Sequence, residues 1–222
     1  MKLGIYMTKK IKLDIVSDVV CPWCIVGYKH LEAAIDELQL QDKIEIEWQP
    51  FELNPDMPKE GEHLRAHVAR KYGASQEDSD RARASITQAG AEYGFVFDYF
   101  DDMKMVNTLD AHMLLAYAHQ EGKQTELKLR LFSAFFTEQK DISQREVLLS
   151  EAESVGLDKT LAEKVFSDQA LRAQIKEAEL QWQQAGISGV PTVIFNRKSM
   201  LTGAQPVESY KSVLLELVAE LS

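Results

Sequence analysis

The sequence predicts an α/β fold in which a large helical insertion interrupts a single sheet. Three observations support this fold class: a strand–helix–strand opening, a long middle stretch with helical periodicity, and a strand–strand–helix ending. The segments before and after the helical stretch each hold too few elements to cover a sheet face. We therefore expect these two flanking segments to combine into one sheet. We therefore expect residues 1–58 and 187–222 to form one βαβ…ββα domain, and residues 59–186 to form an all-helical insertion domain.

The elements of the two flanks follow from periodicity. Residues 11–16 alternate between apolar and polar side chains as a strand does, and residues 25–40 carry apolar side chains at helical spacing. Residues 44–50 alternate again and end at a proline, which indicates a second strand. Near the C-terminus, residues 192–195 and 200–203 are short apolar runs, and Pro206 opens a final amphipathic helix.

Helix-capping patterns place several inserted helices. Ser75, Asn107 and Ser143 each precede an acidic residue at the spacing of an N-terminal cap. Ser143 with Glu146 has the pattern of a capping box. We expect helices to begin at these three points.

Composition excludes several classes of function. The 222 residues include 35 acidic and 25 basic side chains, a net charge of -10, with no dense Lys/Arg run that would track nucleic acid. No apolar run approaches the roughly 18 residues that span a bilayer. The apolar patch at residues 3–7 is too short for a signal peptide. We expect a cytoplasmic protein that binds neither nucleic acid nor membrane, with Met1 and Met7 both candidate start residues.

The two cysteines of the chain, Cys21 and Cys24, stand two residues apart. A disulfide that closes so small a loop removes little entropy from the unfolded chain, so a chemical role is favoured over a structural one. A Cys-x-x-Cys pair between a strand and a helix is typical of a thioredoxin-like redox site. The helix N-terminus favours a thiolate, so we predict a depressed pKa for Cys21, which acts as nucleophile, while Cys24 resolves the mixed disulfide. Pro22 suits the first helical position.

A zinc site is the first alternative reading of the cysteines. Zinc needs four ligands, and only His63 and His67 among the five histidines have suitable spacing, on an expected helix. A structural disulfide is disfavoured in a reducing compartment. The sequence therefore predicts no metal and no cofactor other than a redox-active Cys21–Cys24 disulfide.

Four segments carry a family resemblance: DIVSDVVCPWC, FELNP, NTLDAH and GISGVPT, in this order. Together, over about residues 11–221, they resemble the DsbA family of thiol-disulfide oxidoreductases within the thioredoxin superfamily, and in it the FrnE-like branch. The resemblance implies a thioredoxin-like fold with a CXXC active-site motif, Cys21, Pro22, Trp23 and Cys24. It also implies a cis-proline loop, Val190, Pro191 and Thr192, that faces the cysteines and binds substrate backbone.

The implied activity is disulfide exchange with protein, peptide or small thiol substrates, with glutathione as a candidate reductant. Trp23 stands where the periplasmic members have a histidine, so their strongly oxidising character is not expected, and the direction of electron flow stays open. Kappa-class glutathione transferases and hydroxychromene carboxylate isomerases resemble the chain around Asn54 and Val190 but have serine in place of Cys21. A glutathione-dependent isomerase or transferase is therefore the alternative function.

Three further residues are candidates near the site. Asn107 is most simply a helix cap, and His112 a buried histidine on an apolar stripe, with proton donation to the thiols as the alternative for His112. Glu52 is expected to be a solvated loop carboxylate, with a proton carrier as the alternative. The sequence does not indicate the physiological substrate, the electron partner, the reduction potential or the oligomeric state.

Overall fold

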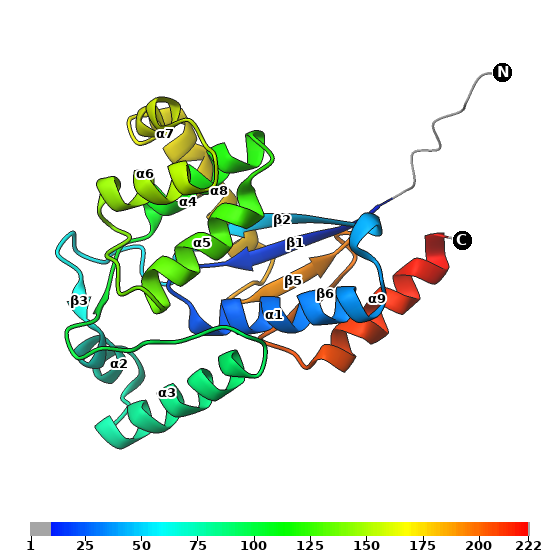
Figure 1. The fold of residues 1–222 in the computed structure, drawn as a ribbon, viewed down its shortest axis with the longest axis horizontal. Helices are drawn as coiled ribbons and strands as arrows, with labels where there is room; N and C mark the ends of the chain where they lie inside the picture. The colour runs from blue at the N-terminus through cyan, green and yellow to red at the C-terminus, as the bar shows by residue number, and fades with distance from the viewer. Residues whose placement is uncertain (1–9, 222) are drawn as a thin grey trace.

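The computed structural model describes residues 10–221, in which helices surround a four-stranded sheet (Figure 1). The choice between Met1 and Met7 and the N-terminal apolar patch lie outside the described residues. The sheet consists of β1 (Ile11–Ser17), β2 (Ile44–Pro50), β5 (Thr192–Phe195) and β6 (Ser199–Thr202), in the order β2-β1-β5-β6.

The central strand of this sheet is β1. It runs parallel to β2 and antiparallel to β5, and β5 runs antiparallel to β6. Nearly all of β1 is buried, as expected for a strand with neighbours on both edges and cover on both faces. Strands from the two ends of the chain thus share one sheet, and the predicted fold class is confirmed.

Helices cover the sheet in two groups. On one side lie α1 (Pro22–Glu37) and α9 (Val207–Leu221), which pack against each other and are seen below the strands in Figure 1. A short 3-10 turn, Gln41–Lys43, joins α1 to β2. The middle of the chain supplies the other helices: α2 (Leu64–Tyr72), α3 (Gln76–Ala91), α4 (Leu109–Gln120), α5 (Gln124–Phe136), α6 (Arg145–Ser154), α7 (Lys159–Val165) and α8 (Gln169–Gln184). Of these, α4, α5 and α8 contact β2, and α3 contacts α1.

The expectation of an all-helical insertion is wrong at one point. Two-residue strands, β3 (Glu62–His63) and β4 (Lys104–Met105), pair in antiparallel fashion between the helices. Gly61 precedes this pair with a φ of 72°, where a Cβ would lie 2.8 Å from the carbonyl oxygen of Met105. Strands of two residues are too short to produce an alternating pattern, so periodicity does not predict them.

One predicted capping box is also wrong. The reciprocal box forms at Ser75 and Asp78, at the start of α3. Ser143 instead directs its backbone N–H and its hydroxyl to Asp141 Oδ1, at 3.0 and 2.6 Å. Because its hydroxyl is engaged in this turn, α6 begins two residues later, at Arg145.

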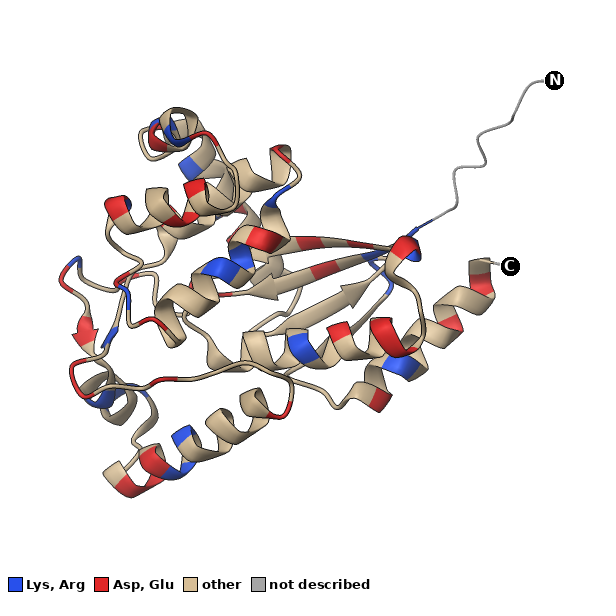
Figure 2. Ribbon diagram, in the orientation of Figure 1, with Lys and Arg blue, Asp and Glu red and all other residues tan. Residues whose placement is uncertain are grey.

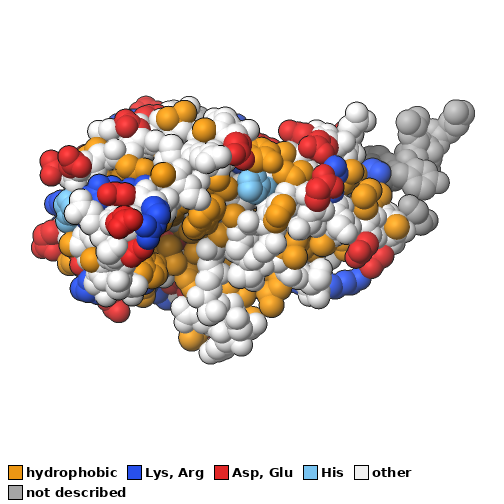
Figure 3. Space-filling view, turned by 90° about the horizontal axis from the view of Figure 1, so that it is seen from below, with side chains coloured by type: hydrophobic (Ala, Val, Ile, Leu, Met, Phe, Trp, Pro, Cys, Tyr) orange, Lys and Arg blue, Asp and Glu red, His pale blue; other side chains and the backbone are white. Residues whose placement is uncertain are grey.

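Charged residues of both signs are interspersed along the helices (Figure 2). Within residues 10–221, no helix is both long and apolar enough to cross a membrane. On the face seen from below, hydrophobic side chains gather in a hollow near the middle of the surface (Figure 3).

An aromatic cluster joins α3, the following loop and α5. Phe97 lies edge-on to Phe95 and Phe136, at centroid distances of 4.9 and 5.1 Å, and stacks on Tyr99 at 5.8 Å. Gly90 of α3 lies directly against this cluster, because a Cβ on Gly90 would come within 2.5 Å of the Phe97 ring. The glycine therefore sets how closely α3 approaches the aromatic rings.

We predict that Gly90→Ala destabilises the protein. In an unobstructed helix this change stabilises by about 1 kcal/mol. Here the added methyl group must displace Phe97, and overpacking costs about 1–3 kcal/mol. Urea unfolding should show a lower free energy of unfolding for Gly90→Ala, but little change for Gly189→Ala, where an added Cβ meets nothing within 4 Å. A stabilised Gly90→Ala variant would contradict this packing.

Candidate active site

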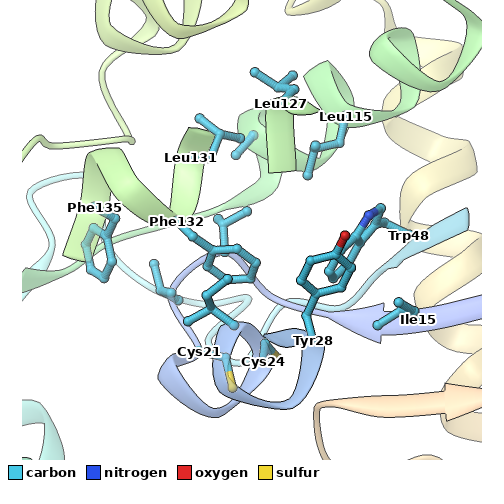
Figure 4. Packing of buried hydrophobic residues seen from close by; sticks show 14 of the residues in the cluster. Ile15, Cys21, Cys24, Tyr28, Trp48, Leu115, Leu127, Leu131, Phe132 and Phe135 are labelled. Atoms are coloured by element: carbon cyan, nitrogen blue, oxygen red, sulfur yellow. The ribbon is translucent and has the colours of Figure 1, made fainter. Parts of the chain in front are cut away.

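The turn between β1 and α1 positions the two cysteines. Cys21 is the N-cap of α1, and its backbone N–H donates to the carbonyl oxygen of Asp18 at 3.2 Å. Pro22 occupies the start of the helix, and the Cys24 N–H donates to the Cys21 carbonyl oxygen at 3.1 Å. Both cysteines are free thiols, with Cys21 4% exposed and Cys24 fully buried. Figure 4 shows their sulfur atoms close together at the start of α1, beneath the aromatic and aliphatic side chains of α5.

The two thiols titrate as a pair, in a way that the sequence did not predict. A hydrogen bond to Cys24 and burial raise the pKa of Cys21 well above its usual value. Burial opposes ionisation of Cys24 as well, but hydrogen bonds from Cys21 and Ser17 and the positive charge of Lys128 lower its pKa. The expected depressed pKa of Cys21 is therefore not found in this conformation. The positive charge of Lys128 and the hydrogen bonds to Cys24 favour the thiolate at the inner sulfur.

A buried cation accompanies the dithiol. Lys128 of α5 is fully buried, its ammonium group lies 3.4 Å from the carbonyl oxygen of Ser17, and it faces the rings of Trp48 and Phe132 at 5.2 Å each. Burial lowers the pKa of Lys128 to about 8, although the negative charges of Cys24, Asp18 and Cys21 act in the opposite direction. A cation that acts on the thiols through its charge favours their ionised form.

Asp18 and His112 form a buried polar pair beside the cysteines. Their side chains are 1% and 2% exposed, and His112 Nε2 donates to Asp18 Oδ1 at 3.3 Å. The other carboxylate oxygen of Asp18 accepts the backbone N–H of Leu53 at 2.8 Å. Burial acts to raise the pKa of Asp18, but the hydrogen bond from His112 and the charges of His112 and Lys128 outweigh it, so the pKa is lowered.

The loop before β5 faces Cys21. The Cys21 thiol lies 3.7 Å from the carbonyl oxygen of Val190, and the Val190–Pro191 peptide bond is cis. Pro191 packs against α1, since a Cβ on Gly27 would lie 3.1 Å from its ring. Thr192 is buried, pairs with β1 at Val16, and its hydroxyl donates to the carbonyl oxygen of Gly189 at 3.0 Å. Cys21 and Val190, which are 169 positions apart in sequence, thus lie next to each other at the Cys21 sulfur atom.

The remaining candidates lie around this centre. Trp23 is 40% exposed, and Asn54 accepts a hydrogen bond from Lys71 at 2.7 Å. The N-cap expected at Asn107 is wrong by one residue, because Thr108 is the N-cap of α4. The Asn107 side chain accepts the Leu109 N–H at 3.0 Å, and its amide lies 3.5 Å from Glu52. None of these three side chains has a hydrogen bond to a cysteine in the described part of the chain.

The expectation of a solvated Glu52 is wrong. Its side chain is 1% exposed, because α8 covers the loop that follows β2, and its carboxylate pairs with Lys176 of α8. The histidines considered for zinc also have other partners: His67 bonds to Glu62 at 2.7 Å, and His63 donates to the Asp101 carbonyl oxygen at 2.6 Å. Among residues 10–221 no group of three or more His, Cys, Asp or Glu side chains could hold a metal ion.

Sequence reasoning missed Asp18 and Lys128. Each leaves a signal, because each is a charged residue in an otherwise apolar segment: Asp18 in residues 15–20, and Lys128 on the stripe formed by Leu127, Leu131 and Phe132. A buried charge without a partner is costly, so a lone charge on an apolar stripe indicates a partner elsewhere in the fold.

Comparison with known proteins identifies one matching family model and several proteins of similar sequence or structure. A family model described as a DSBA-like thioredoxin domain matches residues 12–215. An uncharacterized protein of Bacillus subtilis, YwbO, is 28% identical over 209 residues, which cover 92% of this chain and 96% of that protein. Among solved structures, the probable DsbA oxidoreductase SCO1869 from Streptomyces coelicolor is 28% identical with a TM-score of 0.88, covering 95% of this chain and 91% of that one. The cytosolic disulfide reductase DsbM from Pseudomonas aeruginosa, solved with GSH, shares the fold at 19% identity and a TM-score of 0.65, covering 94% and 99%.

We predict that Lys128→Met makes the thiols less reactive at neutral pH. Removing the buried cation takes away a charge that lowers the pKa of Cys24, so a smaller fraction of the pair is ionised. Alkylation of the reduced protein by iodoacetamide at pH 7 should slow by about tenfold. The exposed Lys123→Met change, at the start of the same helix, should leave the rate unaltered. Equal alkylation rates in Lys128→Met and the unaltered protein would show that the cation does not act on the sulfur atoms.

Proposed function

Because the chain belongs to the family of DSBA-like thioredoxin domains, we propose that it is a disulfide oxidoreductase acting through Cys21 and Cys24. The observation that carries the proposal is the free dithiol at the N-terminus of α1, with a buried lysine beside it and a backbone carbonyl opposite its outer sulfur. We propose protein, peptide or small thiols and disulfides as its substrates.

The geometry supports an order for the two exchange steps. Cys21 is the more exposed thiol, so its sulfur attacks the substrate disulfide and forms a mixed disulfide, while one substrate thiolate leaves. Cys24 then loses its proton and attacks the Cys21 sulfur, which expels the second substrate thiolate and closes the Cys21–Cys24 disulfide. In the first step Cys21 becomes nucleophilic when it loses its proton, and the positive charge of Lys128, which acts on both cysteines, stabilises the thiolate. The reverse sequence oxidises a substrate dithiol.

The loop at Val190 supports a role in positioning substrate. Its carbonyl group lies beside the attacking sulfur, where the backbone of an extended peptide would pass. Backbone pairing of this kind binds peptides with little regard to their sequence. We propose Val190, Pro191 and Thr192 as the substrate-binding loop.

Several finer points belong to the same proposal. The dithiol serves in place of a cofactor, glutathione is the small thiol that we propose as reductant, and the compartment is the cytoplasm. We also propose membership in the FrnE-like branch, with domain limits at residues 58/59 and 186/187. The alternative, a glutathione-dependent isomerase or transferase, would not need Cys24.

Trapping with Cys24→Ser tests the function. This variant can form the mixed disulfide but cannot resolve it, so it should accumulate covalent adducts with its substrates on non-reducing gels. Cys21→Ser should form none, and both variants should lose insulin-reduction activity. Mass spectrometry of the adducts identifies the substrates, glutathione included. Full insulin-reduction activity in Cys24→Ser would contradict the dithiol mechanism and favour the alternative.

We predict that Trp23→His raises the reduction potential. Trp23 is 40% exposed, so a histidine at this position is hydrated and can carry positive charge near the sulfur atoms. A cation there stabilises the thiolate and hence the reduced form. Titration against glutathione redox buffers measures the potential, with Trp23→Phe as the uncharged aromatic control. An unchanged or lower potential in Trp23→His would contradict this role of the dipeptide.

A further inference from the structure

A second cluster of ionisable side chains lies on the helical side of the dithiol. It consists of Glu52, in the loop after β2, with Lys176 and Glu179 of α8. The two carboxylate side chains are 1% and 8% exposed, whereas Lys176 is 43% exposed. The Lys176 ammonium group pairs with Glu52 and lies 3.6 Å from Glu179. Two buried carboxylates thus share one cation that reaches water.

Within this cluster, Glu179 has a carboxylate oxygen in an unusual environment. Its Oε1 is buried and has no hydrogen-bond partner among the described residues. Burial, followed by the negative charge of Glu52, raises the pKa of Glu179 to about 7, while His112 and Lys176 act to lower it. Leaving a buried carboxylate oxygen unpaired is costly when the group is ionised. Glu179 is therefore able to accept and release a proton near neutral pH.

Two groups relate the cluster to the dithiol, His112 through its charge and Leu53 through its backbone. His112 of α4 acts electrostatically on Glu179 and donates to Asp18 at 3.3 Å. Leu53, next to Glu52 in sequence, donates its N–H to the other oxygen of Asp18 at 2.8 Å. Asp18 in turn acts on Cys21 through its charge, and its backbone hydrogen-bonds to Cys24.

The second exchange step requires such a connection. When Cys24 attacks, its S–H bond breaks, the electron pair forms the bond to the Cys21 sulfur, and the substrate thiolate leaves with the electron pair of the mixed disulfide. Cys24 is fully buried, so its proton has no direct route to water. An internal group must accept this proton.

We propose that the Glu52–Glu179–Lys176 cluster is the outlet for the Cys24 proton, which passes to the Asp18–His112 pair and then through Glu179 to water at Lys176. The inference rests on the proposed disulfide exchange. Glu179 touches neither cysteine and acts through His112, so its effect is on proton release and not on substrate binding. The route gives α4 and α8 of the inserted segment a part in the chemistry.

Other charges face this route and bear on its pH dependence. Lys128 of α5 faces Cys24, Cys21 and Asp18, and Lys71 of α2 acts on Asp18. The pKa of Lys128 is about 8, so it also changes charge near neutral pH. Lys128 acts on both cysteines, and its titration affects both exchange steps. Glu179 is expected to affect only the second.

Stopped-flow reaction of the reduced protein with 5,5′-dithiobis-(2-nitrobenzoate) separates the two steps. Attack by Cys21 releases the first thionitrobenzoate, and attack by Cys24 on the mixed disulfide releases the second. In the unaltered protein the second rate should rise with pH through an inflection near 7, as Glu179 becomes ionised and can accept the proton. In Glu179→Gln this inflection should disappear and the second rate at pH 7.5 should fall about tenfold, with the first rate unchanged.

Two further variants make the test decisive. Glu177→Gln, an exposed change on the same helix, should behave as the unaltered protein does. Lys176→Gln removes the cation that lowers the pKa of Glu179, so the inflection should move to higher pH. Lys176 is partly exposed, so Lys176→Gln is expected to fold. Its pH profile therefore tests the proton outlet even if circular dichroism shows that Glu179→Gln does not fold.

The outcomes separate the two proposals. An unchanged second rate and pH profile in folded Glu179→Gln, or an inflection that stays in place in Lys176→Gln, would overturn the proton outlet and leave disulfide exchange intact. The absence of any second, Cys24-dependent release in the unaltered protein would overturn disulfide exchange itself, and the outlet with it.

Discussion

Burying a dithiol that must ionise is the constraint on which this structure depends. A thiolate under a layer of helices loses its hydration, and burial alone would raise the pKa of both cysteines. Lys128 provides a compensating charge from α5, and it is buried as deeply as Cys24. The free-energy cost of burying the Lys128 ammonium group is partly offset by its contacts with the faces of Trp48 and Phe132 and with the carbonyl oxygen of Ser17. The sulfur pair and the lysine therefore depend on each other for stability in their charged forms.

Because of this mutual dependence, the inserted helices do more than shield the sheet from water. Lys128 lies on α5, His112 on α4, and Lys176 and Glu179 on α8, and all of them act on ionisable groups within residues 18–52. Contacts of these three helices with β2 keep their charged side chains at fixed positions behind the redox site. The sheet supplies the sulfur atoms and the peptide-facing loop, and the helices supply the electrostatic environment.

Sequence patterns predicted the parts of the molecule that local periodicity and motif spacing control. The strands of the flanks, α1 with its cysteines, and α9 with its apolar stripe all follow from the spacing of side chains, and the fold class is confirmed. Local patterns did not predict the short β3–β4 pair, or the burial of Glu52, which depends on α8 more than 120 residues later in the chain. The depressed pKa predicted for Cys21 was wrong for a related reason. A helix terminus is visible in the sequence, but the hydrogen bond within the dithiol and the lysine behind it belong to the tertiary structure.

The order of the sheet also has a consequence for synthesis on the ribosome. β1, α1 and β2 are complete by residue 50, but β5, which pairs with the other edge of β1, begins at residue 192. At about 5–20 residues per second, this interval lasts roughly 7–30 s, during which the cysteines have emerged without the strand that completes their sheet or the carbonyl group that faces Cys21. A nascent chain in this state exposes two unprotected thiols to any oxidant in the cell. Its redox chemistry comes under the control of the fold only when β5 has been made.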